Sequence, residues 1–233
     1  MAKLSLVIPC YNEEKNIKEL FDQISKLENK FSIEVIIINN GSSDNSTEVI
    51  RANKEIVKNL KVIEVKKNIG FGHGVKQGIN NATSDLICYT HGDLQVDLDS
   101  IYKAFNVYKS SNLEKKFVKG SRKNRSIIDT LFTILMSIIN SILFRKIVHD
   151  IHAQPNLFHR SLIKNLDFLP NKMNLDLYML LNAKINNYKI LRFEVNFLKR
   201  KHGIGSNDNL IKKVKYSLLS LSSSFSILFH GRF

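Results

Sequence analysis

The sequence contains little cysteine and has no long apolar stretch at its start. Of its 233 residues two are cysteines, Cys10 and Cys88, and both lie in apolar runs without a CxxC or cysteine–histidine spacing. This pattern argues against a disulfide framework and a zinc site, and it predicts a reducing, cytoplasmic location. The apolar stretch from Leu4 ends at Pro9, which is too short for a signal peptide, so we expect none.

Acidic residues are also few in comparison with basic ones. The 21 Asp and Glu residues stand against 35 Lys and Arg residues, which gives a formal net charge of +14. This balance favours an anionic partner such as a nucleotide, a phosphorylated substrate or a phospholipid surface. We expect no nucleic acid partner, because the basic residues are not interleaved with aromatic residues on a recognisable binding element.

Four short apolar runs rich in valine and isoleucine predict buried parallel strands. They cover residues 4–8, 33–38, 62–65 and 86–90. Helical patterns separate them, and we expect Asn12 to cap the first helix, with Glu13 and Glu14 at its positive end. This βαβαβαβ series predicts an α/β fold with a doubly wound sheet.

Polar residues follow each predicted strand, at the edge where ligands bind in such sheets. The four segments cover residues 9–14, 39–44, 68–74 and 91–95. Gly70 and Gly72 in the third resemble a dinucleotide-binding loop, but that fingerprint normally follows the first strand of its unit. We therefore favour a simple role for these glycines in close helix-to-sheet packing.

Taken together, the segments resemble family 2 glycosyltransferases of the dolichyl-phosphate mannose synthase type. Residues 6–13 resemble the family's VIPxYNE opening, residues 39–44 its DDGSxD turn and residues 91–95 its DADLQ metal motif. Further similarities are Gly120-Ser121-Arg122 to GxR, residues 150–160 to DxxxGxxxxxR, and residues 200–206 to RxxGxS. The resemblance implies a nucleotide-diphospho-sugar transferase (GT-A) fold with a doubly wound mixed sheet. It places the glycosyltransferase domain at 1–207, with a nucleotide-sugar half at 1–97 and an acceptor half at 98–207.

The resemblance also implies the residues of a nucleotide-sugar site and its cofactor. The expected binding residues are Pro9, Tyr11, Glu13, Asn39, Asn40, Ser42, Asn68, Gly70, Gly74, His91, Asp93 and Arg200. A divalent cation, manganese or magnesium, is expected because it stabilises the charge that develops on a departing diphosphate. Asp93 is the main predicted ligand, with Gln95 and His91 as further ligands.

Several positions depart from the family pattern. His91 replaces the usual first aspartate; an imidazole suits manganese better than magnesium, and it could instead hydrogen-bond the ribose or the diphosphate. Asn39 and Asn40 replace paired acids, and an amide both donates and accepts hydrogen bonds where a carboxylate only accepts. Gly74 stands where alanine is usual. The nucleobase and the metal therefore stay open.

Arg122 and Asp150 are the residues that the resemblance assigns to acceptor-side chemistry. Arg122 lies in the basic stretch 119–125, which is either a solvated loop or a phosphate-binding element. Asp150, with His152 as a weaker candidate, would serve as a general base for a hydroxyl acceptor. A phosphate acceptor is already ionised and needs no base.

Two further segments predict contact with a membrane surface. The apolar run 126–144, of 19 residues, is barely long enough to span a bilayer, and its polar residues favour an interfacial or partly packed helix. The C-terminal part, 208–233, predicts an amphipathic helix with Lys212, Lys213 and Lys215 near its start, although a docked helix would look similar. We expect a peripheral protein at the cytoplasmic face of an anionic membrane.

The sequence thus predicts an inverting, metal-dependent glycosyltransferase that moves a sugar from a nucleotide-sugar to a lipid-linked or glycan acceptor, such as a polyprenyl phosphate. One alternative is a nucleotidyltransferase acting on a sugar phosphate, which would normally carry a glycine-rich loop where residues 9–14 stand. Another is a non-catalytic member that binds membranes. The sugar, the acceptor and the oligomeric state stay open.

Overall fold

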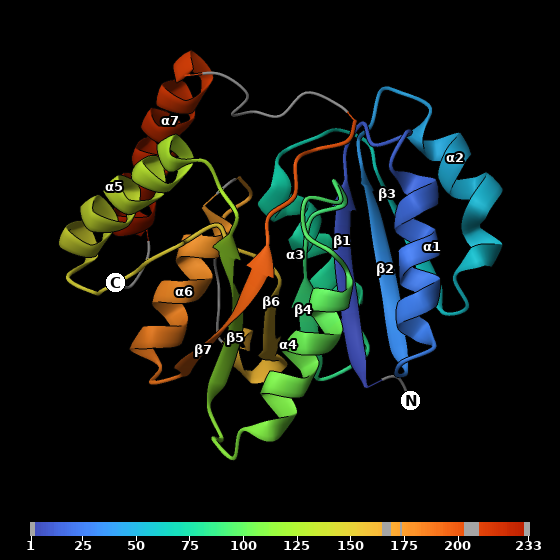
Figure 1. Ribbon diagram of the computed structural model, residues 1–233, viewed down its shortest axis with the longest axis horizontal. Helices are drawn as coiled ribbons and strands as arrows, with labels where there is room; N and C mark the ends of the chain where they lie inside the picture. The colour runs from blue at the N-terminus through green and yellow to red at the C-terminus, as the bar shows by residue number, and fades with distance from the viewer. Residues whose placement is uncertain (1–2, 165–168, 173, 203–209, 231–233) are drawn as a thin grey trace.

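One mixed seven-stranded sheet organises the part of the chain that the computed structural model describes, residues 3–164, 169–172, 174–202 and 210–230 (Figure 1). The strand order is β3-β2-β1-β4-β6-β5-β7, and β6 alone among these strands runs antiparallel to both of its neighbours. The strands are β1 (Leu4–Cys10), β2 (Ile33–Asn40), β3 (Leu60–Val65), β4 (Leu86–Tyr89), β5 (Lys116–Lys123), β6 (Asn156–His159) and β7 (Lys189–Asn196). The predicted doubly wound mixed sheet is confirmed.

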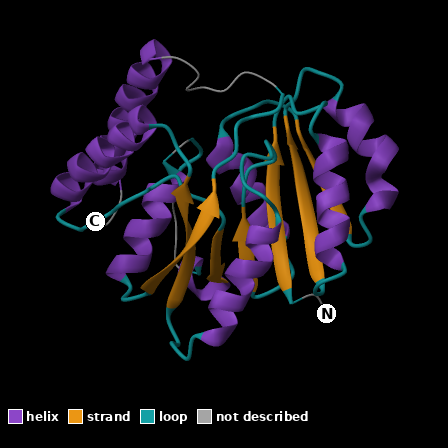
Figure 2. Cartoon of the chain, viewed as in Figure 1, coloured by secondary structure: helices purple, strands orange, loops and turns teal. Residues whose placement is uncertain are grey.

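Helices cover both faces of this sheet (Figure 2). They are α1 (Ile17–Glu28), α2 (Ser46–Asn53), α3 (Phe71–Asn81), α4 (Asp99–Ser110), α5 (Ile127–Phe144), α6 (Leu175–Ile185) and α7 (Leu210–His230), with short 3₁₀ turns η1 (Lys54–Ile56) and η2 (Arg160–Ile163). One core cluster joins β1 to α1 and α4, and a second joins the sheet to α3 and α6. The alternation of strand side chains explains the two clusters, because Leu6 faces the first and Val7 the second.

The predicted role of Gly70 and Gly72 in helix-to-sheet packing is wrong in its partner, because both approach the segment 170–172, and the close contact with the sheet is made by Gly78. A Cβ at Gly78 would lie 2.2 Å from Cγ1 of Val7, so only glycine lets α3 approach β1 this closely. At the start of the helix the N–H groups of Gly72 and His73 donate to the carbonyls of Lys172 and Asn171, at 3.2 and 2.8 Å. These donors are therefore already bonded and do not form a phosphate-binding loop.

One local prediction is wrong, and one of the two alternatives left open for the stretch 119–125 is excluded. Asn12 does not cap α1, which begins at Ile17; with φ +55° the chain turns away, and Asn12 Oδ1 accepts a hydrogen bond from Ser43 N at 2.8 Å. Nor is the stretch 119–125 a solvated loop. It continues β5 to Lys123, and Lys119 is fully buried there.

The helices α5 and α7 pack side by side at one end of the molecule and expose their apolar faces (Figure 1). Ile127 and Ile142 of α5 are 79% and 74% exposed, whereas Ser137 and Asn140 are buried. In α7 Ile211 is 81% exposed, and the predicted apolar face that includes Leu218 is exposed too, while Ser220 and Ser224 are buried. By length and composition alone α5 could cross a membrane, and 17% of it is buried.

The domain boundaries at 97 and 207 stay predictions.

Candidate functional site

Glu13, Asp93 and Arg200, which follow β1, β4 and β7, come together in one place. The guanidinium of Arg200 donates from Nη2 to Asp93 Oδ2 at 2.8 Å and from Nη1 to Glu13 Oε1 at 3.3 Å. Both carboxylates are nearly buried, with side-chain exposures of 9% for Glu13 and 12% for Asp93. Burial raises the pKa of Glu13, which the Asn16 hydrogen bond and the Arg200 charge counteract. Three of the predicted binding residues therefore form one charged cluster.

The end of β2 presents Asn39 and Asn40 beside this cluster. Asn39 is held by its neighbours, because Nδ2 donates to Thr47 Oγ1 at 2.7 Å and to Glu64 Oε2 at 2.8 Å, while Oδ1 accepts from Ser42 N. Asn40 Nδ2 donates to the carbonyl of Gly70 at 3.1 Å. Its Oδ1 is buried and has no partner within the described ranges. Asn40 therefore keeps an acceptor free, as a carboxylate at this position would.

Two departures from the family pattern lie in contact with each other. A Cβ at Gly74 would lie 3.2 Å from Cγ and Nδ2 of Asn40 and 3.0 Å from Cβ of Pro9. Those distances are tighter than ordinary van der Waals contact, so an alanine at 74 would press against both side chains. Gly74 thus makes room for Asn40.

The metal prediction rests on Asp93, and the described residues fit a cation held largely by its substrate. No three His, Cys, Asp or Glu side chains among them are grouped to hold a metal by themselves. Magnesium is commonly bound by one or two carboxylates together with substrate phosphates, so Asp93 alone meets that need. Gln95 donates from Nε2 to the carbonyl of Leu198 at 3.3 Å, and its backbone N–H donates to Asp93 Oδ1 at 3.2 Å; its role as a further ligand through the side-chain carbonyl oxygen stays a prediction.

His91 packs its ring against Phe71, with ring centroids 4.3 Å apart. Burial lowers the pKa of His91, although the charges of Asp93 and Asp176 partly oppose this. A neutral imidazole is the form that ligates a metal or accepts a hydrogen bond. Both roles predicted for His91 therefore stay open to it.

Other predicted donor-site residues lie around the cluster. The side chain of Asn68 contacts Asn40 through Oδ1, at 3.5 Å from Asn40 Nδ2. Gly70 adopts φ +138°, where a Cβ would lie 2.6 Å from the carbonyl oxygen of Asn171, so this position requires glycine. Tyr11 is 45% exposed at the end of β1. Residues 203–206 of the predicted closing segment lie outside the described residues.

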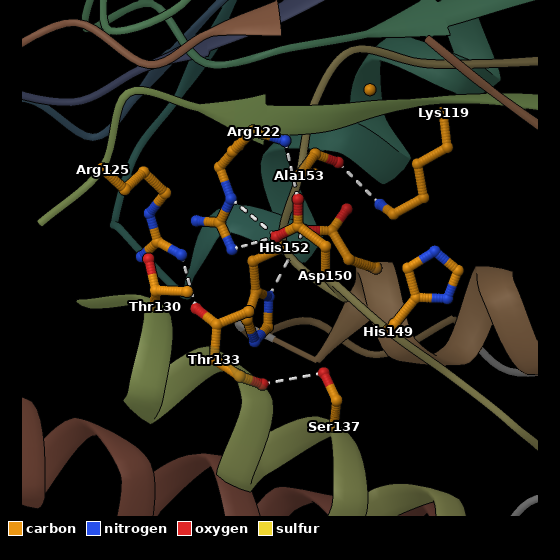
Figure 3. A network of polar contacts seen from close by, with 12 residues as sticks. Lys119, Arg122, Arg125, Thr130, Thr133, Ser137, His149, Asp150, His152 and Ala153 are labelled. Atoms are coloured by element: carbon orange, nitrogen blue, oxygen red, sulfur yellow. Dashed lines mark hydrogen bonds and ion pairs between the residues drawn. The ribbon is translucent and has the colours of Figure 1, made fainter. Parts of the chain in front are cut away.

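On the acceptor side, Arg122 and Asp150 form an ion pair in which two guanidinium nitrogens share Asp150 Oδ1 and the backbone N–H of Arg122 bonds Oδ2 (Figure 3). Arg122 donates to Asp150 from Nε at 2.8 Å, from Nη2 at 2.5 Å and from its backbone N–H at 2.8 Å. Although burial would raise it, the Arg122 charge lowers the pKa of Asp150. This carboxylate is therefore placed to orient Arg122, and it is a weak base.

A cavity of about 530 Å³ opens beside this pair. Arg122, Arg125 and Asp150 line one part of it, and Ile138 and Ile142 of α5 line another. Arg125 donates to Thr133 Oγ1 at 2.5 Å, and its Nε is buried without a partner among the described residues. The cavity thus joins a cationic end to an apolar wall.

A single extended segment joins the two sides. Both Arg122 and Arg125 lie over the ring of Phe197, with guanidinium carbons 5.5 and 5.6 Å from its centroid. The next residue, Leu198, pairs with Gln95 through its N–H at 2.8 Å, and Arg200 then reaches Asp93. Three residue steps span at most about 11 Å between Cα atoms. The segment 197–200 therefore contacts both the donor-side carboxylate and the acceptor-side arginines.

Comparison with known families identifies this arrangement. Residues 5–166 match the family described as Glycosyl transferase family 2. The chain belongs to this family. The more specific mannose synthase type is not established by the match.

Curated relatives of the chain are glycosyltransferases with different acceptors. It is 27% identical over 180 residues to a poly-beta-1,6-N-acetyl-D-glucosamine synthase of Staphylococcus epidermidis, covering 73% of this chain and 42% of the relative. It is 28% identical over 127 residues to the dolichyl-phosphate beta-glucosyltransferase ALG5D of Trichomonas vaginalis, covering 52% and 37%. The chain spans about two fifths of the length of these relatives.

Solved structures of one enzyme share the fold. Glucosyl-3-phosphoglycerate synthase from Mycobacterium tuberculosis, in complex with Mn²⁺, UDP and glucosyl-3-phosphoglycerate, superposes with a TM-score of 0.69 at 18% identity, covering 96% of this chain and 80% of that one. Its complex with Mg²⁺ and UDP gives 0.68 at 15%, covering 96% and 79%. At such identity the likeness establishes the GT-A fold, which confirms the fold prediction.

The structure adds a buried residue that sequence reasoning missed. Asp176, at the start of α6, accepts hydrogen bonds from Tyr89 Oη at 2.8 Å and Asn156 Nδ2 at 3.0 Å, and it lies 3.4 Å from His152 Nδ1. Although burial would raise it, the charge of Lys119 and the His152 hydrogen bond lower the pKa of Asp176 to about 2. The feature of the sequence that could have indicated Asp176 is its position as an acidic residue in the largely apolar stretch 175–185.

Lys119 completes this buried network. Its Nζ donates to the carbonyl of Ala153 at 2.6 Å and to Asn156 Oδ1 at 2.7 Å. Burial lowers the pKa of Lys119 to about 8, and the charge of Asp176 opposes this. The network fixes the segment between Asp150 and β6, and with it the partner of Arg122.

Proposed function

We propose that this family 2 chain is the catalytic part of an inverting glycosyltransferase of the dolichyl-phosphate mannose synthase type. It transfers a sugar from a nucleotide-sugar to a membrane-associated acceptor, with a polyprenyl phosphate as the preferred acceptor. One observation carries the proposal: the segment 197–200 contacts the donor-side Asp93 and the acceptor-side Arg122 and Arg125. A donor and an acceptor bound to these groups would meet in one site.

On the donor side, the residues suit a diphosphate leaving group. A divalent cation, manganese or magnesium, would be held by Asp93 and would supply positive charge to the departing diphosphate. Arg200 would add a bidentate contact to the same phosphates. Asn39 and Asn40, at the end of β2, would contact the nucleoside.

On the acceptor side, the charges favour a phosphate over a hydroxyl. A general base works best with a pKa near the working pH. Asp150 and Asp176, the two carboxylates of this side, have lowered pKa values and are held by ion pairs and hydrogen bonds. A phosphate acceptor needs no base, and Arg122 and Arg125 offer it the cationic end of the cavity.

The lipid part of such an acceptor would lie along the apolar wall. Ile138 and Ile142 line the cavity, and their helix α5 is largely exposed on its outer side. A prenyl chain gains roughly 0.8 kcal/mol for each CH₂ that leaves water. The name of the Trichomonas relative also specifies a dolichyl phosphate acceptor. The name of the staphylococcal relative supports a glycan acceptor as the second candidate.

The proposal includes a location at the cytoplasmic face of an anionic membrane. The exposed apolar faces of α5 and α7 would lie in the membrane interface, because apolar side chains gain free energy when they leave water. Lys212, Lys213 and Lys215 stand at the start of α7, and each basic residue near anionic headgroups contributes about 1 kcal/mol. Lys213 also pairs with Asp129 of α5 at 2.6 Å, which holds the two helices together.

A transfer assay tests the proposed reaction. Vesicles containing a polyprenyl phosphate are supplied with nucleotide-sugars and Mn²⁺, and sugar-linked lipid is measured. For the most active donor, Arg125→Gln is expected to raise the KM for the lipid about tenfold, the equivalent of losing one charge-assisted contact, and to leave donor binding unchanged. Lys123→Gln is the matched control, because Lys123 pairs with Glu194 in the exposed part of β5. Transfer to free glycans alone would replace the lipid acceptor with the second candidate.

A further inference from the structure

Arg200 forms a hydrogen bond with Asp93, the predicted metal ligand. Asp93 has two carboxylate oxygens, of which Oδ1 accepts the backbone N–H of Gln95 at 3.2 Å and Oδ2 accepts Nη2 of Arg200 at 2.8 Å. The second guanidinium nitrogen, Nη1, bonds Glu13 at 3.3 Å. In this arrangement each oxygen of Asp93 already accepts a hydrogen bond, and the guanidinium lies directly at Oδ2.

The charges of the cluster explain this arrangement. Glu13 and Asp93 are nearly buried, and buried carboxylates are costly unless a cation compensates them. Arg200 provides that charge, and its side chain is itself only 23% exposed. A divalent cation on Asp93 Oδ2 would repel the guanidinium at hydrogen-bond distance. The two cations therefore exclude each other at this oxygen.

We propose that Arg200 closes the metal position in the donor-free enzyme, so that the cation binds only together with the diphosphate. This inference rests on the proposed function. A diphosphate supplies both missing parts: oxygen ligands that complete the cation's coordination, and an anionic partner to which Arg200 transfers from Asp93. Arg200 is thus a positioning residue that sets the order of binding, in addition to its predicted contact with the donor.

The proposal predicts opposite effects of one substitution on two ligands. Arg200→Gln removes the competitor for Asp93, so the affinity for Mn²⁺ alone is expected to rise about tenfold or more, or about 1.4 kcal/mol. The same substitution removes a phosphate contact, so the affinity for a nucleoside diphosphate in the presence of Mg²⁺ is expected to fall by a similar factor. A residue that merely stabilised the fold would weaken both.

The first measurement is titration of the full chain with MnCl₂ alone. The electron paramagnetic resonance signal of free Mn²⁺ reports how much of the ion remains unbound. The second is calorimetry with uridine and guanosine diphosphates in Mg²⁺. Lys201→Gln is the matched control: it removes the same charge from the neighbouring residue, which pairs with Glu19 at 2.5 Å, and it should change neither affinity. Arg200→Lys keeps the charge and the fold, and it should leave Mn²⁺ binding weak while lowering diphosphate affinity.

The outcomes separate this inference from the proposed function. Tight Mn²⁺ binding to the wild type, or an unchanged Mn²⁺ affinity in Arg200→Gln, would overturn the closing role even if diphosphates bind. If no nucleoside diphosphate binds the wild type, the proposed function fails, whereas a gain in Mn²⁺ affinity for Arg200→Gln would still support the closing role.

Discussion

The sheet half around β1 and the helix pair α5–α7 are built in opposite ways. In the first, apolar side chains such as Leu20 and Val7 are fully buried and the polar residues stand at the strand ends. In the pair, Ser220 and Ser224 are buried against Asn174 and Ile227 packs into the core, whereas most of the other isoleucines and leucines, such as Ile142 and Leu218, are exposed. Water favours the first arrangement and opposes the second. This comparison is the basis of the proposal that the outer face of the pair contacts a membrane surface and not water.

Charged residues on the outer face of the pair would break this adaptation. We expect the double variant Ile138→Glu, Leu218→Glu to lose binding to anionic vesicles by about 100-fold or more, because each apolar side chain contributes roughly 1.5–3 kcal/mol on burial. Sedimentation with vesicles at low salt measures the loss. Leu113→Glu, at an exposed apolar position in the loop between α4 and β5, is the control.

Wild-type binding should weaken at high salt and on replacing Lys212, Lys213 and Lys215 with Gln, since salt screens the attraction to headgroups. Release only by detergent would indicate a spanning helix instead. A wild type that stays in the supernatant at low salt would remove the membrane from the account.

Truncation of apolar side chains should affect stability in only one of the two regions. Leu20→Ala leaves a cavity between α1 and the sheet, and it is expected to cost about 3 kcal/mol of unfolding free energy. Ile138→Ala, at a position 52% exposed, should cost less than about 0.5 kcal/mol. Urea unfolding of both variants provides the values. Equal costs would mean that the outer face of α5 is packed in solution.

The hydrogen bonds between Asn174 and α7 are expected to contribute less to the free energy of unfolding than Leu20 does. Asn174 Nδ2 donates to the carbonyl of Ser220 at 2.7 Å, and its Oδ1 accepts from Ser220 Oγ at 3.1 Å. Asn174→Ala removes both bonds and deprives the buried Ser220 hydroxyl of this acceptor, although the Ser220 carbonyl keeps its bond from Ser224 Oγ, and we expect a cost of about 2 kcal/mol. Proteolysis in α7 should increase in parallel. Asn112→Ala, at an exposed position before β5, is the matched control and should change neither quantity.

The smallest expected effect is a pH dependence of stability from Asp176. Its pKa lies at about 2 in the folded chain, against 3.8 ordinarily, so its charge stabilises the fold above about pH 4 and the contribution is lost as the pH falls toward 2. From pH 5 to pH 3 the difference in unfolding free energy between wild type and Asp176→Asn should shrink by about 1 kcal/mol. Asp85→Asn, at an exposed site, should show no such trend. A constant difference for Asp176→Asn would argue against the lowered pKa.

The sheet and the donor edge were largely predictable from the sequence. The strands of the first half are continuous apolar runs, and their polar ends fall on one edge because parallel strands all point the same way. The predicted cap at Asn12 failed, because its side chain is used by the turn at Ser43 rather than by α1. Local propensity was overridden there by a tertiary contact.

The acceptor side was less predictable, because its contacts join residues far apart in the chain. Lys119 looked like one cation of a basic stretch, and only the pairing of β5 with β6 places it beside Asn156. Asp176 had no motif around it. The helical spacing in α7 predicted its apolar face correctly, but the sequence could not show that the helix docks through Ser220 and Ser224 instead.

The central claim is that Asp93 anchors a divalent cation and a nucleotide-sugar diphosphate, and thermal unfolding with a panel of nucleotide-sugars tests it most directly. A donor at 100 times its dissociation constant adds about 2.7 kcal/mol, which for a chain of this size raises Tm by roughly 5–10 °C. We predict that at least one donor gives this shift in the wild type with Mn²⁺, and that the shift disappears without the metal and in Asp93→Ala. A panel without any stabilising donor, or an equal shift in Asp93→Ala, would contradict the account.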